Sequence, residues 1–175
     1  MSMTLIEHIE VGSGGATEVE FTSIPQTYTD LYLLCSARTD SGYLDDGITV
    51  KPNSATTNYS ARILLGSGTA AGSSTRTNFD LSLAPGASAT SNTFSSTAIY
   101  FPNYASSNNK SMSSDSVIEN NAAATQMRIY AALWSDTTAI TSLLLESLLG
   151  TNILQYSSFT LYGITAGSDG TTTVS

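Results

Sequence analysis

Apolar and polar side chains alternate in short runs along most of the chain. The last run, residues 158–164, places Phe159 and Leu161 on one face and Tyr162 on the other, as expected for a β-strand with one buried face. Gly163 interrupts the buried face, which predicts a bulge or a close approach by another segment. A segment this apolar near the end of a chain must be covered, and an interior position in a sheet would cover it. We therefore expect the earlier strands to form a sandwich that this strand completes.

Similar runs predict further strands upstream. They lie at about residues 5–11, 17–22, 31–38, 48–51, 59–65, 79–83, 94–101, 116–118, 127–134 and 140–145. Residues 31–38 are apolar on both faces, which favours a central strand. Residues 66–76 and 103–114 are polar and are expected to be loops. Residues 138–149 lack the polar face of a surface helix. The pattern predicts an all-β fold: a single antiparallel β-sandwich, jelly-roll-like, of about nine to eleven strands.

One domain is expected over residues 1–175, with no linker or repeat. Residues 1–15 are expected either to form an N-terminal arm or to enter the sandwich as an ordinary first strand. Residues 167–175 are expected to form a flexible or extended tail. Apolar side chains near the start, with little chain before them to cover them, are candidate contacts to a partner protein or to another subunit: Leu5, Ile6, Ile9 and Val11.

The composition is poor in charge and rich in hydroxyls. Only 11% of the residues are charged and the net charge is -8, whereas Ser and Thr number 28 and 25. Hydroxyls and amides must therefore supply solubility, and Thr in strands with Ser in turns favours an all-β fold. Six scattered basic residues cannot form the stripe that neutralises phosphates, so nucleic acid is not expected as a partner. No signal peptide or membrane span is indicated, and synthesis in a cytoplasm is expected.

Catalytic and metal-binding chemistry has few candidate residues. The chain has one cysteine, Cys35, and one histidine, His8. This excludes a zinc site of three or four nitrogen and sulfur ligands from one chain. Cys35 is expected to be a buried thiol and His8 a surface or edge residue. The acidic cluster Asp40, Asp45 and Asp46 does not match a calcium loop and is interpreted as solvated turn residues. We expect no enzyme activity, cofactor or metal.

Aromatic residues offer a different kind of site. Exposed tyrosine and tryptophan are typical of carbohydrate-binding faces and of protein interfaces. The candidates for a glycan-facing cluster are Tyr59, Tyr104, Trp134 and Tyr156. Trp134 is the best platform for a stacked sugar, although a core position at a strand end is the favoured alternative.

Four sets of segments in the chain have a familiar order and spacing. They are FTSIPQTYTDL at 21–31 with SAR at 36–38, YFPNY at 100–104 with Lys110 and Ser111, WSDTTAITSL at 134–143 and QYSSFTLYGI at 155–164. Together these segments resemble a group of tailed-phage virion proteins. The resemblance extends over about residues 4–166 and rests on the order and spacing of these pieces. It implies a small β-sandwich that serves as a structural, decoration or tail-fibre-like protein. It implies no catalytic motif.

Two virion roles are open. The chain starts at its own Met1 with no coiled-coil shaft, which favours a capsid decoration (cement) protein that binds the outside of the assembled head and stabilises it. Its partners would be the major capsid protein and copies of itself, as a homotrimer at the virion surface. The alternative is a tail-fibre or receptor-binding domain that recognises host surface glycans.

Overall fold

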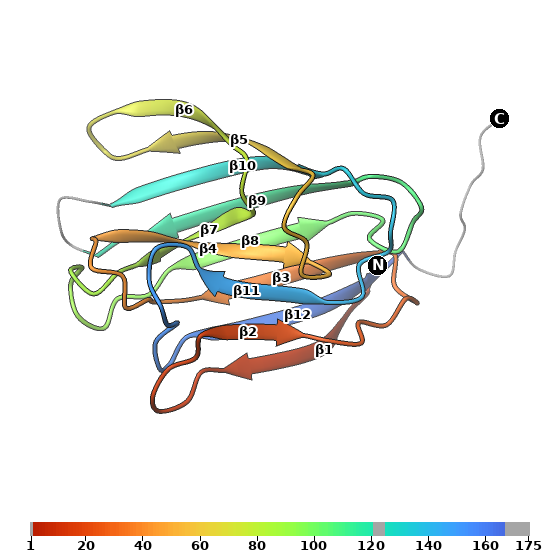
Figure 1. Ribbon diagram of the computed structural model, residues 1–175, viewed down its shortest axis with the longest axis horizontal. Helices are drawn as coiled ribbons and strands as arrows, with labels where there is room; N and C mark the ends of the chain where they lie inside the picture. The colour runs from red at the N-terminus through yellow and green to blue at the C-terminus, as the bar shows by residue number, and fades with distance from the viewer. Residues whose placement is uncertain (1, 121–124, 167–175) are drawn as a thin grey trace.

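The computed structural model describes residues 2–120 and 125–166, which form twelve β-strands in two antiparallel sheets and no helix (Figure 1). The strands are β1 (Ser2–Glu10), β2 (Glu18–Phe21), β3 (Asp30–Ser36), β4 (Asp45–Pro52), β5 (Tyr59–Gly66), β6 (Ala71–Arg76), β7 (Asp80–Pro85), β8 (Ser96–Phe101), β9 (Lys110–Ile118), β10 (Gln126–Trp134), β11 (Leu143–Ser147) and β12 (Ser158–Thr165). The all-β sandwich is confirmed, with twelve strands instead of nine to eleven. The tail expected over residues 167–175 lies outside the described residues.

The two sheets have different widths. The large sheet has eight strands in the order β1-β12-β3-β8-β9-β10-β5-β6, and the small sheet has four in the order β2-β11-β4-β7. The chain changes sheet at every connection between consecutive strands except β5 to β6, β8 to β9 and β9 to β10. The layers β1-β12-β3-β8 and β2-β11-β4-β7 form a jelly roll of eight strands. The antiparallel pairs β5–β6 and β9–β10 widen one layer only. We call the strands β9, β10, β5 and β6 the wing; Figure 1 shows β10, β5 and β6 extending past the small sheet.

The core lies between the two sheets and is built by the predicted alternation. Most inward positions of β2, β3, β11 and β12 carry a large apolar side chain, and most of these side chains are fully buried. Gly163 of β12 is an exception. Each buried aliphatic or aromatic side chain contributes about 1.5–3 kcal/mol to folding. The fully buried apolar side chains of these four strands are Phe21, Leu31, Leu33, Leu143, Leu145, Phe159 and Leu161.

The free edge of β7 rests on serine hydroxyls of the large sheet. Leu83 N–H donates to Ser116 Oγ at 2.8 Å, and Ser114 Oγ donates to the Leu81 carbonyl at 2.7 Å. Ser116 Oγ also lies 2.5 Å from Thr97 Oγ1, which lies 2.9 Å from Ser82 Oγ. All of these hydroxyls are buried, where an unpaired polar group is costly. Side chains of β8 and β9 thus replace the backbone partners that an edge strand lacks.

Two segments predicted as loops are strands. Residues 66–76 contain β6, and residues 103–114 contain the first half of β9. The buried face of β9 carries Ser114 and Ser116, whose hydroxyls bond to β7, in place of the apolar residues that usually mark a buried face. The inward position Ser74 of β6 is likewise polar. Both predictions failed because the hydrophobic pattern shows no buried face where hydroxyls occupy it.

The last strand occupies the interior position that its pattern predicts. β12 lies between β1 and β3, and β3 in turn lies between β12 and β8. Gly163 marks a close approach: a Cβ atom there would lie 2.3 Å from the ring of Tyr28. The aromatic ring therefore occupies the space that the missing side chain leaves.

We expect Ser116→Ala to lower the free energy of unfolding by about 1–3 kcal/mol, because Leu83 N–H loses its acceptor in a buried site. The control is Ser111→Ala, an exposed position on the same strand, which should change stability little. Urea unfolding monitored by circular dichroism measures both. Equal stabilities of the two variants would show that the hydroxyl contacts do not hold β7.

Candidate interaction surface

The four apolar residues predicted as contacts do not share one surface. Leu5 is 54% exposed on the edge strand β1, and Ile6 and Ile9 are half-buried against the core. Val11 is itself a core residue, because the chain turns inward there and pairs its backbone with Tyr156 and Ser157. Leu5 is thus the member of the set that is open to a partner. Residues 2–10 form β1, paired to β12 over most of their length.

Leu5 continues into a row of three tyrosines across neighbouring strands. Tyr162 of β12 pairs with Leu5 on one side and with Tyr32 of β3 on the other, and Tyr32 pairs with Tyr100 of β8. The residues before and after each tyrosine, except Gly163, are large apolar side chains of the core, so the tyrosines point to the opposite, outer face of the large sheet. All three are half-buried. We call Leu5, Tyr162, Tyr32 and Tyr100 the tyrosine row.

A buried carboxylate fixes one end of this row. Asp30 accepts hydrogen bonds from Tyr100 Oη at 2.8 Å and from Asn103 N–H at 2.8 Å. The bond from Tyr100 and the partial burial of the ring raise the pKa of Tyr100. Directly opposed residues on one face lie about 5 Å apart, so the row is a continuous aromatic strip. The alternation over residues 158–164 predicts that Tyr162 lies on the face opposite Phe159 and Leu161. It does not predict that Tyr162 lies beside Tyr32 and Tyr100, because a period of two does not specify strand order.

Three of the four aromatic residues predicted to face a glycan are core residues. Tyr59, Tyr104 and Trp134 are each at most 7% exposed, so the prediction that they form an exposed cluster is wrong. The favoured alternative for Trp134, a core position at a strand end, is confirmed at the end of β10. The Tyr59 ring packs on Phe79 with ring centroids 4.4 Å apart, and Tyr104 Oη donates to the Pro25 carbonyl. Tyr59 begins β5 and Trp134 ends β10, and both side chains, like that of Tyr104, belong to the hydrophobic core.

Tyr156 is the exposed member of that set. Its side chain is 66% exposed, its φ is 70°, and its N–H donates to the Val11 carbonyl at 3.0 Å. It lines a depression of about 490 Å³ together with Asn92, Phe94 and Gln155. An aromatic ring can stack on a sugar ring, and the two neighbouring amides can form hydrogen bonds with its hydroxyls.

Two side chains of the acidic cluster stabilise the fold through hydrogen bonds. Asp46 is buried, contrary to the prediction of a solvated turn, and its two oxygens accept four hydrogen bonds, from Thr39, Gly47, Ser147 and Leu149. Asp40 accepts from the N–H groups of Thr151 and Asn152 and from the Asn152 amide. Both carboxylates thereby tie the 148–152 segment to the start of the small sheet.

The single cysteine and the single histidine lie where the sequence predicts them. Cys35 is buried, which raises the pKa of its thiol, and His8 is exposed on β1 with Nδ1 2.8 Å from Thr160 Oγ1. Within residues 2–120 and 125–166, no group of three or more His, Cys, Asp or Glu side chains could hold a metal ion. No helix of the described chain is long and apolar enough to cross a membrane.

Asp80 is the most unusual ionisable group. It is 2% exposed, and its Oδ2 lies 3.8 Å from Arg76 Nε and from Arg128 Nη1. Its Oδ1 has no hydrogen-bond partner in the described chain. Burial raises the pKa of Asp80 to about 6, against the opposing effect of the two guanidinium groups.

Comparison with protein-family models, curated proteins and solved structures gives no match. The relation to phage virion proteins therefore stays a prediction from the sequence.

We expect the free energy of unfolding to fall as the pH rises from about 4 to about 6. The folded-state pKa of Asp80 lies above its usual 3.8, so the folded state holds the proton more tightly and loses that advantage as the group ionises. A shift of roughly two units corresponds to about 3 kcal/mol. Asp80→Asn should flatten this slope.

Urea unfolding at several pH values between 4 and 7 measures the slope, with Glu20→Gln on the exposed face of β2 as the control that keeps it. An unchanged slope in Asp80→Asn would show that another group causes the pH dependence.

Proposed function

We propose that the protein is a structural protein of a phage virion, a decoration protein that binds the outside of the assembled head and stabilises it. Its partners are the major capsid protein and copies of itself, as a homotrimer at the virion surface. The resemblance of the sequence to phage virion proteins supports this class of function. The single structural observation that carries the proposal is the tyrosine row with Leu5 on the outer face of the large sheet.

The row has the composition of an interface core. Aromatic residues are enriched and charged residues depleted at the centre of protein interfaces, and here three tyrosines and one leucine adjoin without a charged residue between them. The surface is a sheet face and not a cleft, which suits another protein surface better than a small substrate. Rigid aromatic side chains also lose little conformational entropy on binding.

Binding would stabilise the head by mass action. A protein that binds the assembled shell and not its dissociated subunits shifts the equilibrium toward the shell. Many copies each contribute a small free energy, and no catalysis is required. The low fraction of charged residues, 11%, fits wet, hydrogen-bonded contacts between subunits.

A receptor-binding domain of a tail fibre is the second candidate, and Tyr156 favours it. An exposed aromatic residue with positive φ beside a depression of about 490 Å³ is the kind of strained surface position that often has a function. The ligand would be a host surface glycan.

The location on the virion distinguishes the two candidates. We expect fluorescent or gold-labelled protein to be found over the whole head when intact particles are imaged. Label confined to the tip of the tail would contradict the decoration role and support the receptor-binding role, and Tyr156→Ala should then reduce binding to host cells.

We expect Tyr32→Ala to weaken binding to heads that lack the protein by about 30-fold, since central aromatic residues of interfaces often contribute about 2 kcal/mol. Leu5→Asp should have a similar effect from the edge of the row. Tyr43→Ala, at a 64% exposed loop position, is the matched control. Co-sedimentation with heads measures binding, and thermal unfolding checks that each variant is folded. Full binding by both row variants would exclude the row as the contact surface.

A further inference from the structure

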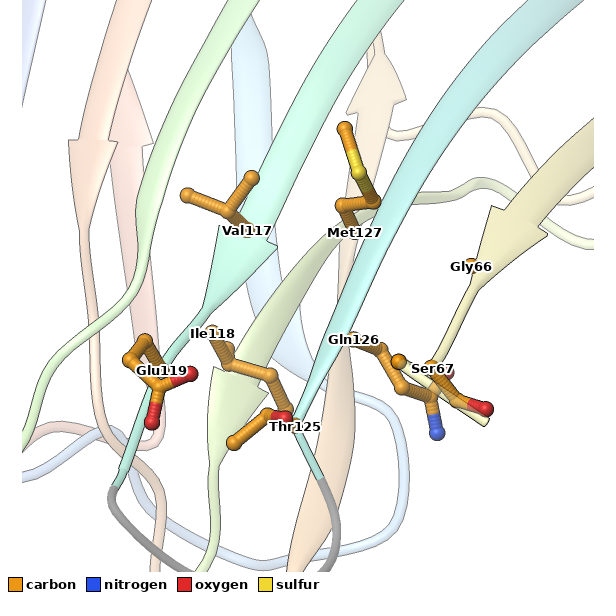
Figure 2. Close-up of a pocket in the computed structure, with 9 residues that line it drawn as sticks. Gly66, Ser67, Val117, Ile118, Glu119, Thr125, Gln126 and Met127 are labelled. Carbon is orange, nitrogen blue, oxygen red and sulfur yellow. The ribbon is translucent and has the colours of Figure 1, made fainter. Parts of the chain in front are cut away.

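The wing carries an apolar surface on its outer face. Four side chains there are well exposed: Leu64 by 59%, Met127 by 56%, Ile129 by 54% and Val117 by 39%. The strand register makes them neighbours, because Met127 pairs with Val117 and Ile129 pairs with Leu64. Figure 2 shows Val117 and Met127 side by side on β9 and β10. We call these four residues the wing patch.

The patch also has a shallow cavity suited to an apolar side chain. The cavity has a volume of about 210 Å³ and lies between β10 and the hairpin of β5 and β6. Its lining residues are all apolar: Leu64, Leu65, Gly66, Ala71, Met127 and Ile129. Contiguous exposed apolar surfaces on folded domains mark sites of contact with another macromolecule.

Two opposite charges lie on either side of the patch. Asp115 of β9 pairs with Ile129, and Arg62 of β5 pairs with Ala131, one outer position further along β10. Both side chains are exposed, and neither forms an ion pair within the part of the chain that the structure describes. The acidic flank therefore lies on β9 and the basic flank on β5, with β10 between them.

We propose that the wing patch is the interface between two copies of this chain, packed face to face about a two-fold axis that runs along β10. This axis places β9 of each copy over β5 of the other, as in aligned packing of two sheets. Arg62 of one copy then lies diagonally opposite Asp115 of the second copy, and the same contact occurs twice. The surface is thus complementary to itself in charge, which identifies a second copy as the partner.

The other face-to-face arrangement is disfavoured by the same charges. A two-fold axis across the strands would place β9 over β9 and bring Asp115 close to its own equivalent, which repels. For a chain with net charge -8, the arrangement that pairs Arg62 with a carboxylate is the one that offsets repulsion between copies. The proposed contact does not depend on the role at the virion, and it leaves the tyrosine row outside the strands that meet.

The oligomeric state of the purified full chain tests the interface. Sedimentation equilibrium should give a dimer, or a hexamer if trimers also form, and Ile129→Glu should raise the dissociation constant of the two-fold contact by about 30-fold or more. Leu149→Glu is the matched control, because Leu149 is a 57% exposed apolar residue outside the wing. Leu64→Ser provides a second wing variant, and thermal unfolding checks the fold of each.

Charge reversal tests the orientation. Arg62→Asp or Asp115→Arg alone should weaken association by about 10-fold, since each leaves like charges opposed. The double variant should restore association to within a few-fold of the wild-type chain, because each reversed charge again meets an opposite charge. A monomer at 100 µM, as a rough upper working concentration, or an oligomer that the wing variants do not weaken, would overturn the interface. A double variant that stays as weak as the single ones would overturn the two-fold arrangement.

Discussion

The position of the two sheets relative to each other depends on how the edge of β7 is satisfied. β7 is the last strand of the small sheet, so one side of its backbone lacks a neighbouring strand. Ser116 of β9 provides the missing acceptor and Ser114 the missing donor, and Thr97 and Ser82 extend the chain of hydroxyls. A larger apolar side chain at these positions would keep β7 away from β9 and leave buried backbone groups unpaired. Small hydroxyl residues satisfy both requirements.

This closure has a consequence for the rest of the large sheet. The small sheet ends at β7, which contacts β9 in the middle of the large sheet. The large sheet continues beyond β9 through β10, β5 and β6 (Figure 1). A jelly roll with two layers of equal width would have no such extension. The wing therefore has an outer face with exposed apolar side chains and an inner face on which Arg128 lies 3.8 Å from the buried carboxylate of Asp80 at the start of β7.

The outer face of the large sheet therefore has two regions with different chemistry. The half of the large sheet that backs the jelly roll carries the tyrosine row, and the wing carries the aliphatic wing patch between Asp115 and Arg62. A tyrosine can remain in water because its hydroxyl is solvated, whereas aliphatic side chains at this exposure gain more from being covered. This difference is the physical basis for proposing a capsid contact at the first and a contact between copies at the second.

The sequence by itself determined which segments are strands wherever a buried face is apolar. Its alternation identified β2, β5, β10 and β12, the central place of β3 and the close approach at Gly163. It did not identify β6 or the start of β9, since most of their inward positions are not apolar, and it did not exclude Tyr59 and Tyr104 from the surface. Only the tertiary structure decided which strands are neighbours. A period of two specifies the face on which a side chain lies, but the tyrosine row and the wing patch arise from pairing between strands far apart in the chain, which no local pattern encodes.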